Sequence, residues 1–101
     1  MNYLIDIKPS DKKTKKLKIV LSLDGKKKTF HFGSKNSITY VEGASKKKRE
    51  NYIKRHKVRE DWNEINNGSL SKRILWGDSK NIVENIKQYL DDFDIEYECR
   101  V

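Results

Sequence analysis

The chain has 101 residues, of which 38% are charged and 35% are hydrophobic, and its formal net charge is +8. This length suits one domain with a single modest core. The only cysteine, Cys99, excludes an internal disulfide and a zinc site built on cysteines, and no apolar run approaches the roughly 18 residues of a membrane span. The first residues lack the features of a signal peptide, so we expect an intracellular protein.

The positive charge is concentrated in the first part of the chain. Residues 1–60 contain 18 Lys and Arg against 6 Asp and Glu, whereas residues 61–101 contain 5 against 9. A one-sided positive potential favours polyanions such as nucleic acid. A solvated, lysine-rich face that only keeps the protein soluble is the alternative explanation.

The N-terminal third predicts antiparallel strands. Residues 2–7 are rich in strand formers. Residues 17–32 alternate between apolar and polar side chains on either side of Asp24-Gly25, a dipeptide that suits a two-residue hairpin turn. The basic link and the hairpin together span residues 8–33.

Three helices are expected after the hairpin, with one possible short strand at residues 38–41 before them. A basic helix covers residues 45–60, and Ser45 is its N-cap. A short helix covers residues 69–76. An amphipathic helix with a strong 3.6-residue apolar repeat covers residues 79–93.

Side-chain oxygens near the last two helices suggest their caps. Ser69 or Ser71 is expected to cap the short helix, and Asp78 or Ser79 the amphipathic helix, because these side chains accept from free backbone amides. Gly77 is expected to end the short helix.

The final residues, 95–101, alternate again and predict a closing strand that pairs with residues 2–7 or with another copy of the chain. The acidic segment just before them could also contact the basic face of a neighbour. The order of elements indicates a single α+β domain over residues 1–101, in which a hairpin-based antiparallel sheet packs against two main helices and a short helix.

The basic helix offers the main indication of function. At 100° per residue, Arg49, Tyr52, Ile53, His56 and Glu60 share one side, and the other side is basic. Cations in the first helical turn oppose the helix dipole at a cost on the order of tenths of a kcal/mol each, which a bound anion would offset. The candidate phosphate contacts come from the hairpin, the basic helix and the short helix: Lys26, Lys27, Lys28, Lys46, Lys47, Lys48, Lys54, Arg55, Arg59, Lys72 and Arg73.

These contacts are expected to be with the phosphate backbone. The sequence contains no helix-turn-helix, zinc-finger or leucine-zipper pattern, although Asn51, Arg55 and Arg59 suit base edges. Ser69 and Ser71, with the adjacent Lys72 and Arg73, could form a small phosphate site, but capping alone also explains both serines.

His56 has three possible roles. With Glu60 it forms an i, i+4 pair, and His31 adds a second imidazole, so the three could hold a divalent metal. A histidine could also act as the general base of a nuclease. The third interpretation, which we favour, is a half-buried network that ties the basic helix to Trp62 and to residues 69–76.

One set of motifs resembles a known family. The motifs are HFG at His31–Gly33 and SLSKRILW at Ser69–Trp76, together with Arg49, Tyr52, Arg55, His56, Glu60 and Trp62. With these motifs, residues 30–90 resemble a family of small uncharacterised proteins of large double-stranded DNA viruses, the mimivirus-like and algal viruses. The resemblance implies a viral origin, a location in the viral factory or the virion, and no enzymatic activity that could be transferred.

The prediction is therefore a non-catalytic protein that binds nucleic acid, DNA more than RNA, as an accessory or packaged viral protein. It needs no cofactor, metal or membrane, and it can form a homo-oligomer through the terminal strand. The alternative is a virion structural or protein-interaction module without a nucleic-acid role, and the third hypothesis is a metal-dependent nuclease.

Overall fold

The computed structural model describes residues 2–97. It confirms the α+β class: a three-stranded antiparallel sheet, in the order β1-β2-β3, is followed by helices. No helix within the described residues is long and apolar enough to cross a membrane. The elements are β1 (Tyr3–Pro9), β2 (Lys15–Leu23), β3 (Lys26–Ser34), the 3₁₀ turn η1 (Tyr40–Glu42), α1 (Lys46–Lys57), α2 (Asn67–Leu70), the π-helical turn η2 (Ser71–Leu75) and α3 (Ile82–Asp92).

The predicted hairpin is confirmed. Asp24 and Gly25 have φ values of 52° and 81°, the positive values that this turn requires. On the other side of β2, the pairing with β1 shifts register between Leu4 and Asp6. This bulge keeps Leu4 on the core face and leaves the intervening Ile5 46% exposed.

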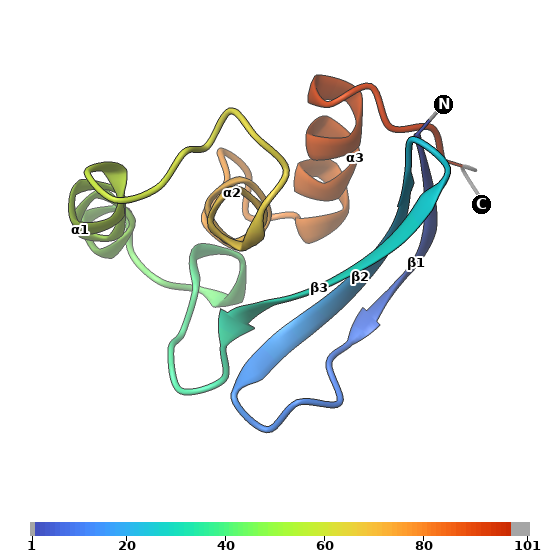
Figure 1. Cartoon of the computed structure of the whole chain (residues 1–101). Coiled ribbons are helices and arrows are strands. Elements are labelled where there is room, and N and C mark those ends of the chain that lie inside the picture. Colours follow the sequence, from blue (N-terminus) through green and yellow to red (C-terminus); the bar gives the residue numbers. More distant parts are fainter. Residues whose placement is uncertain (1, 98–101) are drawn as a thin grey trace.

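The core lies between the sheet and the helices that follow it. Figure 1 shows the helices on one side of the sheet, with α2 and α3 nearer to it than α1. Side chains from β2, β3, the 67–76 segment and α3 meet there, and all of them are at most 4% exposed: Ile19, Leu21, Phe32, Leu70, Ile74, Leu75, Trp76, Tyr89 and Leu90.

The basic helix and the possible strand differ from their predicted bounds. α1 ends at Lys57 and not at residue 60, because the amides of Val58 and Arg59 donate to the carbonyl of His56, only two and three residues back, and close a turn. The segment at residues 38–41 is not a strand. The Glu42 carboxylate accepts from both the amide and the hydroxyl of Thr39, which folds the chain into η1.

The predicted caps of the last two helices are wrong. Asn66 caps α2 by accepting from the amide of Ser69, whose hydroxyl accepts in turn from the Asn66 amide. Asn81 caps α3 by accepting from the amides of Val83 and Glu84. Asparagine caps a helix as well as serine does, and in both cases the asparagine lies directly before the first helical residue.

The predicted terminal strand is confirmed only at one position. Glu96 forms a single parallel bridge with Tyr3. The Glu96 amide donates to the carbonyl of Asn2, and the Glu96 carbonyl accepts from the amide of Leu4. The pairing partner is thus the N-terminal strand, as one alternative predicted. The rest of the predicted strand, 98–101, lies outside the described residues.

Gly77 ends the helical segment near the predicted position. Glycine is required there because a side chain would not fit, and not because the backbone needs a positive φ. Its φ is not positive, and it is buried between η2 and α3. A Cβ at this position would collide with the carbonyl oxygen of Arg73 and lie 2.8 Å from Cγ of Asn85. Asn85 cannot move away easily, because its amide donates to the carbonyls of Ile74 and Ser79.

We expect Gly77→Ala to lower the free energy of unfolding by about 3 kcal/mol, since overpacking against backbone cannot relax. Denaturant unfolding followed by circular dichroism measures this change. Gly25→Ala is the control: its positive φ costs about 1 kcal/mol, but nothing lies within 4 Å of its new Cβ. Equal losses in the two variants would contradict the steric explanation.

Candidate nucleic-acid interface

The inner side of α1 carries the residues that were predicted to share one side of the helix, and we call this side the inner stripe of α1. Ser45 caps the helix, with its Oγ 3.1 Å from the Lys48 amide that donates to it. Tyr52 is only 8% exposed and stacks on the ring of Trp76, with the ring centroids 4.4 Å apart and the planes 7° apart. His56 stacks on the same tyrosine at 4.1 Å. Three rings in a column therefore fix the position of the helix.

Arg49 fixes the same helix near its first turn. Its Nε donates to the carbonyls of Trp76 and Gly77 at 3.1 and 3.0 Å, and its Nη2 donates to the Asp78 carboxylate at 2.9 Å. The guanidinium also lies 5.4 Å from the ring centroid of Tyr40. These contacts and the ring column together determine which side of α1 faces away from the body.

The structural network predicted for His56 is confirmed. His56 Nδ1 donates to one Glu60 oxygen at 2.9 Å, and the Trp62 indole donates to the other at 2.9 Å. His31 lies elsewhere, 2.8 Å from the hydroxyl of Ser10. Within residues 2–97 no three His, Cys, Asp or Glu side chains are placed to hold a metal together.

The outward side of α1 carries an uncompensated positive surface. All of its Lys and Arg side chains are exposed, and none has a carboxylate oxygen within 4.0 Å in the described part of the chain. Glu50 is the single acid in residues 46–59. We call this surface the α1 basic face, and it consists of Lys46, Lys47, Lys48, Lys54, Arg55, Lys57 and Arg59.

The hairpin lysines do not join this face. Lys26, Lys27 and Lys28 are exposed at the start of β3. In Figure 1 the β2–β3 turn lies near the N-terminus and α3, whereas α1 lies at the other end of the molecule. The hairpin cluster and the α1 cluster, which the sequence analysis listed together as candidate phosphate contacts, are therefore separate surfaces.

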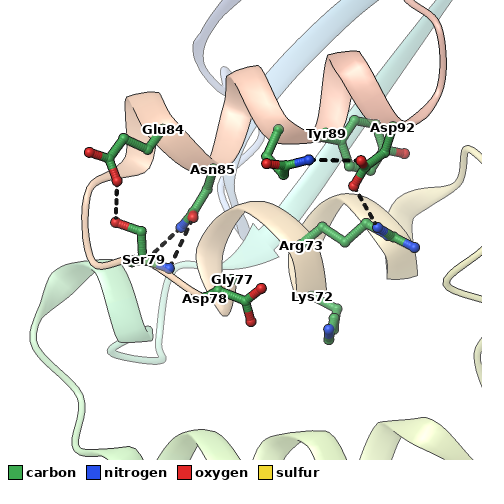
Figure 2. A pocket seen from close by; sticks show the side chains of 10 residues that line it. Lys72, Arg73, Gly77, Asp78, Ser79, Glu84, Asn85, Tyr89 and Asp92 are labelled. Atoms are coloured by element: carbon green, nitrogen blue, oxygen red, sulfur yellow. Dashed lines mark hydrogen bonds and ion pairs between the residues drawn. The ribbon is translucent and has the colours of Figure 1, made fainter.

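Lys72 and Arg73, two of the candidate phosphate contacts, interact instead with other residues of the same chain. Arg73 donates to the Trp62 carbonyl at 2.8 Å. It also donates to the Asp92 carboxylate at 3.0 Å (Figure 2). Lys72 lies 5.1 Å from the ring centroid of Trp62, and burial lowers the pKa of its ammonium. The pocket of about 250 Å³ that they line also contains the carboxylates of Asp78, Glu84 and Asp92.

The two serines of the same segment are also occupied. The hydroxyls of Ser69 and Tyr89 are hydrogen-bonded at 2.8 Å in the interior. Ser71 Oγ accepts from the Gly33 amide at 3.2 Å. The small phosphate site suggested for residues 69–73 is therefore not assembled.

A polar cleft of about 290 Å³ lies beside α1. It is formed by the start of β2, the end of β3 with its following loop, α1 and α2. Burial raises the pKa of the Tyr52 phenol, which therefore stays neutral in the cleft wall. The residues that line the cleft include Lys15, Ser34, Ser37, Tyr52, Arg55, His56 and Glu60.

Among these seven lining residues, only Arg55 was a candidate phosphate contact, and three others come from the segments before α1. Lys15, Ser34 and Ser37 lie on separate segments, and helical or strand periodicity gives no sign that they meet α1. The basic link that contains Lys15 was a partial signal. Lys15 and Ser34 are brought together because they are partners in the β2–β3 pairing, and the Lys35 amide extends this pairing by donating to the Thr14 carbonyl.

Comparison with known proteins places the chain in a family. A model described as "Family of unknown function (DUF5754)" matches residues 5–56, slightly more than half of the chain. The chain belongs to this family. No curated protein and no solved structure matches it.

The DUF5754 segment includes much of the candidate interface. It covers the sheet from residue 5 onward and α1 as far as His56, so it contains Lys15, Arg55 and most of the α1 basic face. The segment that supports α1 from inside, with Trp76 and Asp78, follows after it. The family match thus coincides with the positively charged half of the chain.

Proposed function

We propose that this DUF5754 protein is a non-catalytic nucleic-acid-binding protein, with DNA as the preferred partner, and that the α1 basic face contacts the phosphate backbone. The observation that carries the proposal is the set of seven exposed cations without a carboxylate partner in residues 2–97. Such a surface binds phosphates and releases their counterions, which supplies affinity in ordinary salt.

The charge pattern argues against a surface that serves only solubility. Such surfaces usually mix both signs of charge, which lowers mutual repulsion. The acids of this chain are instead concentrated after residue 60. The cations that form ion pairs, such as Arg49 and Arg73, hold the fold together and lie outside the face.

The size of α1 suits a duplex. A helix of 12 residues is about 18 Å long, and double-stranded DNA carries about one charge per 1.7 Å of its axis. Several phosphates are therefore within reach of one helix. The resemblance to proteins of large DNA viruses supports a role as an accessory or packaged protein in the viral factory or virion.

The first test is a fluorescence-anisotropy titration with a short DNA duplex over a series of salt concentrations. We expect micromolar or tighter binding at low salt and, for about six phosphate contacts, a log–log slope near −5. A duplex RNA of the same length tests the preference for DNA. Absence of binding at about 50 mM salt would reject the proposal.

The edge strand β1 favours a second candidate, a protein-interaction module. Tyr3 and Ile5 are 47% and 46% exposed on this strand, and only Glu96 pairs with its outer side within the described residues. Exposed strand edges of this kind pair with other chains. Light scattering during gel filtration would detect such a dimer, and Ile5→Lys should dissociate it.

A further inference from the structure

The cleft beside α1 has an aromatic wall. Trp76, Tyr52 and His56 form the ring column, and the His56 side chain at its end is 37% exposed. All three residues line the cleft. A partly exposed ring at the end of a fixed column is a platform on which a nucleobase can stack, because every base has a π-face.

The same cleft has groups that suit a phosphate. Lys15 and Arg55 line it, and neither has a carboxylate within 4.0 Å in the described residues. The hydroxyls of Ser34 and Ser37 also line it and form no hydrogen bond within residues 2–97. The single carboxylate in the lining, that of Glu60, is already occupied by His56 and Trp62.

We propose that this cleft binds one unpaired nucleotide, with its phosphate between Lys15 and Arg55 and its base against the exposed part of the His56 ring. The inference rests on the proposed function, because Arg55 belongs to both the α1 basic face and the cleft. A strand that is bound along the α1 basic face would continue into the cleft at Arg55. A cleft of about 290 Å³ is large enough for one small ligand and too small for a duplex.

The test compares a blunt DNA duplex with the same duplex extended by a short single-stranded overhang. We expect the overhang to bind about tenfold more tightly, which is the scale of one stacked base. Aminopurine, a fluorescent adenine analogue, placed in the overhang should lose emission on binding because stacking quenches it. The full-length chain is used throughout.

Three variants locate the effect. Lys15→Gln should abolish the preference for the overhang and leave the affinity for the blunt duplex within about twofold, since Lys15 lies outside the α1 basic face. Lys26→Gln removes the same charge at the other end of the molecule and should retain the preference. His56→Gln should abolish aminopurine quenching, and the Lys15 variant keeps the test decisive if the His56 variant does not fold.

The outcomes separate the two proposals. Equal binding of blunt and overhang duplexes by the natural protein would overturn the cleft assignment and leave the α1 basic face in place. Loss of the preference in Lys26→Gln as well as in Lys15→Gln would also overturn it. Binding of free adenosine monophosphate without any binding of DNA would overturn both proposals and indicate a site for free nucleotides.

Discussion

Replacing both Lys54 and Arg55 by glutamate should weaken duplex binding roughly 100-fold at about 0.1 M salt. Each phosphate contact contributes about one factor of ten at this salt concentration, and the new carboxylates repel the backbone. Both side chains are exposed and have no partner in residues 2–97, so the fold should persist. Anisotropy over a salt series should show a log–log slope that is smaller by about two.

The hairpin offers a matched control for this variant. Lys26→Glu with Lys27→Glu changes the net charge from +8 to +4, as the α1 variant does, because each substitution replaces a positive charge by a negative one. The hairpin lies at the other end of the molecule (Figure 1). If contacts on α1 matter, the control should lose about tenfold or less. Equal losses would mean that net charge alone attracts DNA, and no loss in the α1 variant would remove the helix from the interface.

Short sequence patterns predicted the elements whose conformation is determined by residues close together in the chain. The hairpin followed from Asp24-Gly25, because both residues tolerate positive φ. The inner stripe of α1 followed from helical periodicity, and the network of His56 with Glu60 and Trp62 was part of the same prediction. Caps were less predictable, since Asn66 and Asn81 competed with nearby serines for the same role.

The role of each cation depended on contacts between distant segments. Arg73 and Arg55 look alike in the sequence, yet Arg73 is held by Trp62 and Asp92, whereas Arg55 faces solvent and the cleft. The cleft itself combines segments from β2 to α2, and no periodic pattern connects them. Lys15 was therefore recognisable only as part of a basic link.

Two arginines of α1, Arg49 and Arg55, should contribute very differently to the stability of the fold. Arg49→Ala should lower the free energy of unfolding by about 3 kcal/mol, because the buried carbonyls of Trp76 and Gly77 lose their donor. In a domain of this size that corresponds to a melting temperature lower by roughly 12–20 °C. Differential scanning calorimetry measures this shift. Arg55→Ala, in contrast, should change the free energy of unfolding by no more than about 0.5 kcal/mol.

Arg49→Lys should not restore the lost stability. An ammonium group is a single point of charge and cannot reproduce the planar fork that reaches two carbonyls and the Asp78 carboxylate together. At a temperature where all variants are folded, Arg55→Ala should weaken duplex binding about tenfold, while Arg49→Ala should leave it within about threefold. The opposite ranking in duplex binding would mean that Arg49 contacts the nucleic acid, and the binding face of α1 would then lie on the inner side of the helix. The opposite ranking in calorimetry would mean that Arg55, and not Arg49, attaches the helix to the body.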